Sequence, residues 1–304
     1  MEDVLCDLTT VNTVNTKELT RILPIDILVW GAEHLRDLPW RRTRNPWFVL
    51  VAEVMLQQTQ IDRVLSKWPA FLEEFPTVIS CAVAPTSEVV KQWEGMGFNR
   101  RAVLLHQAAK SIKDNHGGEV PLELDELLLL PGIGPYTARA ILAFAYEQDS
   151  AVVDTNVGRV LARWMGRRLK PAEAQELADR SVPLGEGWAW NQAVLDFGSM
   201  VCRSKNPKCE ECPIYSSCAW QGIGVDPAKG SAGVSGTQSR FEGSDRQGRG
   251  KLVAALRKNP IKKSELAEVM GWPLDPERAE RVASTVISDG LATSEGDTLS
   301  LPQI

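Results

Sequence analysis

Apolar residues recur at intervals of three and four from Lys17 to about Trp220, which is the spacing of amphipathic α-helices. Alternation of apolar and polar positions, which is typical of half-buried strands, is hard to find in this stretch. Thr86-Ser87-Glu88 and Pro171-Ala172-Glu173 are typical helix starts, and His116-Gly117-Gly118 is a typical helix end. We therefore predict one all-α domain of about ten helices over residues 1–222.

The pattern changes in the last quarter of the chain. Residues 221–239 contain five glycines, three serines and no aromatic residue, so we expect a flexible basic linker over residues 223–248. Residues 240–263 hold eight Arg or Lys and two acidic residues. Residues 249–304 predict three short helices and a hairpin, at 249–258, 262–270, 276–289 and 291–301. This order suggests a small winged-helix-like domain, and a helical appendage with a solvated basic face is the alternative.

Composition excludes several classes of protein. The 304 residues are 43% hydrophobic and 24% charged, with a formal net charge of −5, so a core can form and overall disorder is excluded. No apolar stretch approaches the roughly 20 residues that a bilayer requires, so we expect no membrane association. The acidic start, Met1-Glu2-Asp3, does not resemble a secretory signal, and we expect a cytoplasmic protein. Any surface for nucleic acid must then be a local basic patch.

Four of the six cysteines lie within 17 residues, at Cys202, Cys209, Cys212 and Cys218. In a reducing compartment, four close thiolates point to a metal centre, and both zinc and an iron–sulfur cluster fit this spacing. Three cations follow the first cysteine, at Arg203, Lys205 and Lys208. A loop fixed by metal would present their charge to a phosphate backbone, and a purely structural role is the alternative.

Two carboxyl groups are distinguished by their neighbours. Every residue from Trp47 to Leu56 other than Glu53 is apolar. A helix here would bury the Glu53 carboxyl and raise its pKa, so that it could act as a general acid, unless the side chain reaches water at the rim. Asp154 precedes an expected helix, where it can cap the helix or serve as a carboxylate that Asn156 orients. Such a pair suits cleavage of a bond at a sugar C1′, because one group protonates the leaving group and the other stabilises an oxocarbenium-like transition state.

A glycine-containing turn, Leu130-Pro131-Gly132-Ile133-Gly134-Pro135, joins two expected helices at 124–130 and 136–146. Gly132 and Gly134 allow the backbone to approach a ligand, and Pro135 suits the first turn of a helix. Exposed N–H groups at a helix start favour an anion such as a DNA phosphate. An ordinary helix–helix turn is the alternative.

In this order the motifs resemble those of the helix-hairpin-helix DNA glycosylases. The motifs are Leu-Pro-Trp-Arg (38–41), Glu-Val-Met-Leu-Gln-Gln-Thr-Gln (53–60), Leu-Pro-Gly-Ile-Gly-Pro-Tyr-Thr-Ala (130–138), Val-Asp-Thr-Asn-Val (153–157) and the four cysteines. The chain is most similar to the MutY-like adenine DNA glycosylases, and residues 240–250 are similar to the tail of actinobacterial members. The resemblance implies an all-α helix-hairpin-helix glycosylase fold with a [4Fe–4S] cluster in loop 202–218.

The same resemblance implies an activity in base excision repair. A monomer, associated with the nucleoid, would bind double-stranded DNA containing A:8-oxoguanine or A:G mispairs. It would extrude the adenine and hydrolyse its N-glycosidic bond.

Roles for individual residues also follow from the resemblance. Glu53 would protonate adenine N7, and Asp154 would stabilise the sugar cation. Tyr136 would support Asp154, and Asn156 would orient it. Arg41 would reach the extruded base or Glu53. The remaining residues would contact the lesion, the opposite base or the DNA backbone, namely Gln57, Gln58, Thr59, the wedge residue Phe98, Gly132, Gly134, Arg203, Lys205 and Lys208.

Departures from the family pattern leave alternatives open. Bifunctional relatives carry a lysine nucleophile where this chain has Tyr136, so we expect a monofunctional enzyme. The 56 residues from 249 to 304 are too few for the Nudix-like domain of many adenine glycosylases. A glycosylase for mispaired thymine or uracil is one alternative, although the string 57–59 favours adenine. The other is a non-catalytic DNA-binding or redox-sensing module, which the pair of carboxyl groups disfavours.

Overall fold

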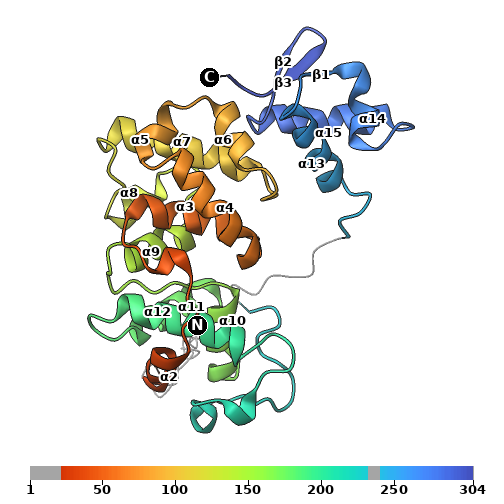
Figure 1. Ribbon diagram of the computed structural model, residues 1–304. Helices are drawn as coiled ribbons and strands as arrows, with labels where there is room; N and C mark the ends of the chain where they lie inside the picture. Colours follow the sequence, from red (N-terminus) through yellow and green to blue (C-terminus); the bar gives the residue numbers. More distant parts are fainter. Residues whose placement is uncertain (1–21, 232–239, 304) are drawn as a thin grey trace, which may run out of the picture.

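The computed structural model describes residues 22–231 and 240–303 (Figure 1). In the first of these ranges the backbone is helical, and its α-helices are α2 (Asp26–His34), α3 (Pro46–Leu56), α4 (Ile61–Glu74), α5 (Val78–Val83), α6 (Thr86–Gln92), α7 (Arg100–Asn115), α8 (Leu124–Leu128), α9 (Pro135–Phe144), α10 (Thr155–Met165), α11 (Pro171–Ser181) and α12 (Gly187–Met200). Three 3₁₀ turns accompany them, at Pro39–Arg41, Cys209–Glu211 and Tyr215–Ser217. The predicted all-α fold of the first domain is confirmed for residues 22–222. The first 21 residues of the predicted domain lie outside them.

The helices form two lobes, each with its own apolar core (Figure 1). Helices α3–α9 pack together in the first lobe. Helix α2 comes back to join α10–α12 and the cysteine loop in the second lobe, so both ends of this region share one core. The close approach of α2 and α12 depends on Gly31, because a Cβ atom there would lie 2.5 Å from the Cβ atom of Ala193. The chain crosses between lobes after α2 and after α9, and these crossings lie beside the candidate site.

The C-terminal residues form a third unit, whose elements are α13 (Asp245–Leu256), β1 (Ile261–Lys262), the 3₁₀ turn Lys263–Glu265, α14 (Leu266–Met270), α15 (Pro276–Ser288), β2 (Thr293–Glu295) and β3 (Thr298–Ser300). The antiparallel sheet has the order β1-β3-β2. Helix, strand, two helices and a hairpin follow one another as in a winged helix. The predicted helix at 262–270 was wrong at its start, because Ile261 and Lys262 pair with β3 instead.

The C-terminal unit is docked on the first lobe (Figure 1). The Arg257 guanidinium donates hydrogen bonds to the Val90 carbonyl (3.0 Å) and to Asn99 Oδ1 (2.9 Å). At the other end of the unit, the Ser87 N–H donates to the Pro302 carbonyl at 2.9 Å. These specific contacts fix the position of the unit against α6 and α7.

The predicted linker, 223–248, was wrong at both ends. Helix α13 begins at Asp245 because the Ser244 side chain caps it. Asp226 forms a 2.7 Å ion pair with Arg163, and Ser231 is buried against Leu169. The segment also holds three basic and three acidic residues, so it is not basic. Residues 232–239 lie outside the described ranges. Among the described helices, none is both long and apolar enough to cross a membrane.

Candidate active site and iron–sulfur loop

Glu53 lies in the middle of α3, and its side chain is only 5% exposed. Helix α3 starts at Pro46, with the Asn45 side chain accepting hydrogen bonds from the N–H groups of Trp47 and Phe48. The other residues of the helix are apolar, and most of them are buried against neighbouring helices. Glu53 Oε2 has no hydrogen-bond partner in the described part of the chain. Burial therefore raises the pKa of the Glu53 carboxyl to about 7, although a hydrogen bond from Tyr136 and the charge of Arg41 oppose this rise.

Tyr136, in the first turn of α9, faces the Glu53 carboxyl. Burial and the two nearby carboxyl groups, Glu53 and Asp154, raise the pKa of the phenol well above its usual range, so the hydroxyl stays protonated and donates to Glu53. The family resemblance implied that Tyr136 supports Asp154. In the structure its hydrogen bond goes to Glu53, and its influence on Asp154 is electrostatic.

Asp154 caps α10. Its Oδ1 atom accepts hydrogen bonds from the N–H groups of Asn156 and Val157, both at 2.7 Å. Its Oδ2 atom accepts one from Asn156 Nδ2 at 2.8 Å. Burial raises the pKa of Asp154, and these three hydrogen bonds, which favour the charged form, oppose that rise. The Asp154 carboxyl thus both caps α10 and is oriented by Asn156.

A buried ion-pair cluster closes the cavity on the other side. Asp196, on α12, is fully buried and binds Arg41 through two contacts of 2.7 and 2.9 Å. It also binds Arg36 at 2.5 Å. Burial raises the pKa of Asp196, but hydrogen bonds from the two arginines outweigh it and lower the pKa below its ordinary value. Arg41 is therefore held in place by Asp196 and acts on Glu53 through its charge.

A cavity of about 210 Å³ lies between the two lobes, and Asp196 stands behind its wall as the partner of Arg36 and Arg41. Of the residues singled out from the sequence, it contains Arg41, Glu53, Thr59, Tyr136, Asp154 and Asn156. Sequence reasoning missed Arg36, Gln192 and Asp196. The sequence could have indicated that Asp196 is a buried carboxyl, because it lies between the apolar residues Leu195 and Phe197, just as Glu53 lies among apolar residues.

The other predicted base contacts lie at the end of α3. Gln57 Nε2 donates to Thr137 Oγ1 at 3.2 Å and so ties α3 to α9. Gln58 is exposed, and its backbone adopts the left-handed conformation (φ 53°). Phe98, also left-handed (φ 43°), is 44% exposed. Gln58 and Phe98 line a second hollow next to the cavity.

Buried Arg101 holds this corner together, and sequence reasoning missed it. Its Nη1 atom donates to the carbonyls at the end of α3, including that of Gln57 at 2.6 Å. Its Nη2 atom donates to Thr59 Oγ1 at 2.9 Å and to the Gly97 carbonyl at 3.1 Å. Burial lowers the pKa of Arg101 to about 10, so the guanidinium remains charged near neutral pH.

The two glycines of the hairpin have different environments. Gly132 has a left-handed backbone (φ 76°), and a Cβ atom there would lie 2.7 Å from the Cβ atom of Leu104. Gly132 therefore has a packing role. A Cβ atom at Gly134 would meet nothing within 4 Å, and Gly134 precedes Pro135 as the N-cap of α9. The N-terminus of α9 is thus open to a ligand at Gly134.

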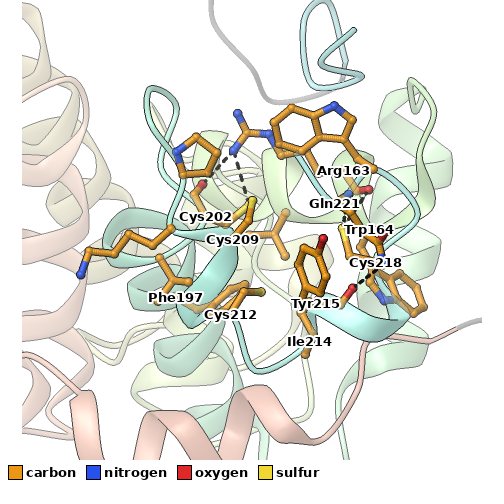
Figure 2. Close-up of a pocket in the computed structure, with 15 residues that line it drawn as sticks. Arg163, Trp164, Phe197, Cys202, Cys209, Cys212, Ile214, Tyr215, Cys218 and Gln221 are labelled. Atoms are coloured by element: carbon orange, nitrogen blue, oxygen red, sulfur yellow. Dashed lines mark hydrogen bonds between the residues drawn. The ribbon is translucent and has the colours of Figure 1, made fainter. Parts of the chain in front are cut away.

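Four cysteine sulfurs surround an apolar cavity beside α10 and α12 (Figure 2). In the described residues, no three His, Cys, Asp or Glu side chains are arranged to hold a single metal ion. The cysteines instead stand around a shared space, which is how the thiolates of a multi-iron cluster are placed. Gly222 approaches Cys209, and a Cβ atom there would lie 3.1 Å from Sγ. The four thiols fit an iron–sulfur cluster as ligands.

Arg159 connects the cysteine loop with the catalytic cavity. Its Nε atom donates to the Cys202 carbonyl at 2.8 Å, and its Nη2 atom donates to Asn156 Oδ1 at 2.7 Å. Asn156 in turn binds Asp154. The side chains of Arg159 and Asn156 therefore connect the cysteine loop to the carboxyl group of Asp154.

The three loop cations are not equivalent. Arg203 and Lys205 line a polar hollow of about 540 Å³ with Asn156 at the start of α10. Lys208 lies at the cysteine cavity instead, and its ammonium pairs with Glu211 at 2.8 Å. Arg203 and Lys205, but not Lys208, thus lie on the surface beside the cavity that contains Glu53 and Asp154.

Comparisons with known proteins agree with this geometry. Residues 51–183 match the HhH-GPD superfamily of base excision DNA repair proteins, and residues 202–218 match the iron–sulfur binding domain of endonuclease III. The adenine DNA glycosylase of Mycolicibacterium smegmatis is 39% identical, over 91% of this chain and 94% of that protein.

Two solved structures are similar. A thermostable thymine-DNA glycosylase is 30% identical with a TM-score of 0.61, over 65% of this chain and 94% of that one. An endonuclease III trapped covalently on DNA is 25% identical with a TM-score of 0.58, over 65% and 93%.

Replacement of Glu53 by glutamine should abolish a pH-dependent loss of stability. The folded-state pKa of about 7 lies above the ordinary value of 4.5, so the wild type loses stability as pH rises from about 4.5 through about 7. At about pH 8, Glu53→Gln should be more stable by on the order of 3 kcal/mol, and the difference should vanish below about pH 4.5. Denaturant unfolding across this range measures it. Exposed Glu277→Gln is the control, and equal pH profiles for all three proteins would contradict the buried acid.

Loss of one loop cysteine should remove the cluster. Cys212→Ser should lower bound iron and sulfide well below the wild-type content, because a cluster needs all four thiolates. Cys81→Ala is the matched control, since burial raises the pKa of this core thiol to about 12 and it lies in α5. Equal iron in Cys212→Ser and wild type would show that the loop is not the ligand set.

Proposed function

Because the chain belongs to the HhH-GPD superfamily of base excision DNA repair proteins and, within it, to the adenine DNA glycosylases, we propose that it removes adenine mispaired with 8-oxoguanine or guanine in double-stranded DNA. It is a DNA N-glycosylase, and Cys202, Cys209, Cys212 and Cys218 hold its [4Fe–4S] cluster. The observation that carries the proposal is the cavity that brings a protonatable Glu53 and an oriented Asp154 together. The bound cluster supplies a rigid anchor for loop 202–218.

Glu53 is the general acid. An adenine that leaves its deoxyribose takes both electrons of the bond between C1′ and N9, and a proton on the purine makes this departure easier. A carboxyl with a pKa of about 7 is substantially protonated at neutral pH. Tyr136 and Arg41 limit the rise of this pKa, so the group can also release its proton.

Asp154 stabilises the positive charge that develops on the sugar. Its two oxygens are fixed by the start of α10 and by Asn156, so no reorientation is needed when the charge forms. Water then adds to C1′, and its proton can return to the Glu53 carboxylate. The net reaction consumes one water and releases free adenine.

The DNA backbone has two candidate contacts beside the cavity. The open N-terminus of α9 at Gly134 offers backbone N–H groups to a phosphate. Arg203 and Lys205 lie on the other side, next to Asn156. Such contacts would hold both flanks of an extruded nucleotide, and we propose that the protein acts as a monomer on nucleoid DNA.

A thymine or uracil glycosylase is the second candidate, because the similar thymine-DNA glycosylase structure shares the fold at 30% identity. The adenine glycosylase of Mycolicibacterium smegmatis matches 91% of this chain at 39% identity, whereas the thymine-DNA glycosylase structure covers 65% of it, and this difference favours adenine. A non-catalytic module is disfavoured, since a binding protein needs neither a buried acid nor an oriented carboxylate.

Base release from defined duplexes should distinguish these functions. Wild type should free adenine from A:8-oxoguanine and A:G duplexes, and should free little thymine from T:G. Glu53→Gln and Asp154→Asn should each lower the single-turnover rate by at least about 100-fold while DNA affinity is retained. The wild-type rate should fall as pH rises through about 7, because Glu53 must carry a proton.

Chromatographic identification of the free base measures this result. Exposed Glu277→Gln and Asp114→Asn serve as matched controls and should retain the wild-type rate. Thymine as the main product would support the second candidate, and no product from any duplex would support the non-catalytic module.

Borohydride should trap very little protein on DNA. Strand cleavage through a Schiff base needs an amine at the cavity, and no lysine is among the described residues that line it. Tyr136→Lys places an amine at the first turn of α9 and is the positive control. A strong adduct with wild type, as judged by gel electrophoresis, would contradict a monofunctional enzyme.

A further inference from the structure

Residues 219–231, which follow the last cysteine of the loop, form a strap along the cysteine cavity. Both ends of the strap are fixed to the second lobe. The Trp220 N–H donates to the Arg163 carbonyl at 3.2 Å, and the Ser231 hydroxyl oxygen accepts a hydrogen bond from the Leu169 N–H at 3.0 Å. The Trp220 side chain also lines the cavity, beside that of Arg163 (Figure 2). The strap is therefore part of the cavity wall.

The backbone of the strap lies close to two of the four sulfurs. The Gln221 N–H donates to Cys218 Sγ at 3.5 Å. Gly222 has a left-handed backbone (φ 78°), and a Cβ atom there would lie 3.1 Å from Cys209 Sγ. The strap therefore covers these two sulfurs directly, and it leaves little room for a small molecule to reach them.

Arg163, on α10, fixes the strap at two separate points. The Arg163 residue is only 1% exposed. Its Nε and Nη2 atoms donate to the two carboxylate oxygens of Asp226 at 3.0 and 2.7 Å. Its guanidinium also lies 4.4 Å from the centre of the Trp220 ring. One buried side chain thus holds both the start and the middle of the strap.

The same guanidinium contacts the first cysteine of the loop. Its Nη1 atom donates to the carbonyls of Cys202 and Arg203 at 3.2 and 2.7 Å, and it lies 3.5 Å from Cys202 Sγ as a donor. A buried charge is costly unless an opposite charge compensates it. Asp226 supplies this charge, so the contacts of Arg163 with the cysteine loop depend on the strap.

Apolar burial contributes little to the middle of the strap. The side chains of Ile223 and Val225 are 72% and 86% exposed. The stretch between Trp220 and Asp226 is therefore held mainly by the contacts of these two residues with Arg163. Loss of one of these contacts should let the strap open locally while the helices stay folded.

We propose that the strap is a cover that slows the loss of the iron–sulfur cluster, and that the ion pair of Asp226 with Arg163 is its latch. The four thiolates hold the cluster, and the surrounding shell controls whether water or a competing ligand can reach it. With the strap closed, iron is protected, and it leaves when the strap opens. The proposal concerns retention of the cluster and does not depend on which base the enzyme removes.

The test measures how fast the loaded enzyme loses iron to an excess of EDTA, as followed by the visible absorbance of the cluster. Asp226→Asn keeps the size of the side chain but removes the charge that compensates Arg163. Its initial iron content should equal that of wild type, because all four thiolates remain. Its iron loss should be at least about tenfold faster.

Variants of Trp220 test the second contact of the latch. Trp220→Ala should also accelerate iron loss, whereas Trp220→Phe should stay closer to wild type because a ring still covers the Arg163 guanidinium. Val225→Ala is the matched control, since this side chain belongs to the strap but is exposed. If Asp226→Asn is isolated without iron, the comparison of Trp220→Ala with Trp220→Phe decides the question.

Hydrogen exchange reports the opening of the strap directly. The amides of Trp220 and Gln221 should exchange faster in Asp226→Asn than in wild type, and the helical amides of α12 should keep their protection. Equal rates of iron loss in wild type, Asp226→Asn and Trp220→Ala would overturn the proposal. An equal acceleration by Val225→Ala, or loss of protection throughout α12, would also overturn it, because either result would mean general destabilisation. These measurements need no base release, so they are independent of the glycosylase assay.

Discussion

The carboxyl of Glu53 lies in an apolar helix, away from water, and its desolvation determines the chemistry of the whole cavity. A charged carboxylate there would be costly, and the pKa of about 7 therefore leaves a large fraction of the group protonated near neutral pH. Tyr136 and Arg41 moderate this effect, and both depend on other parts of the molecule for their positions. Tyr136 is placed by the hairpin before α9, and Arg41 is placed by Asp196 on α12. A single buried acid thus requires the two lobes to meet correctly.

The second lobe holds the buried carboxylate of Asp154 in a fixed orientation. The start of α10 supplies two N–H groups to Asp154, and Asn156 supplies a third donor. Arg159 extends this chain of contacts to Cys202. A cluster held by four cysteines fixes the loop and so supports the orientation of Asp154 through Arg159 and Asn156. This connection gives a structural reason for an iron–sulfur loop in an enzyme whose reaction transfers no electrons.

The C-terminal unit is more than an appendage on a linker. It is docked by Arg257 and by the pairing of Ser87 with Pro302, and it forms one wall of the hollow beside the cavity. Phe241 and Arg246 lie just before and within the first turn of α13. Their position depends on where α13 begins, and α13 begins at the Ser244 cap.

The local sequence was sufficient to predict the helices, the cysteine loop and the apolar surroundings of Glu53, because each of these depends on residues that are near neighbours in the chain. Val49 and Leu50, before Glu53, already implied a buried carboxyl. The partners of the key groups come from distant segments, and only the folded chain selects them. Asp196 lies 155 residues beyond Arg41, and Arg101 lies 44 beyond Gln57. The linker was misjudged for the same reason, since Asp226 and Ser231 are ordered by contacts with Arg163 and Leu169 that composition does not reveal. The spacing of residues along the chain is enough to determine a helix. The site, in contrast, needs side chains from distant segments to come together, and only the packing of the two lobes decides which side chains meet.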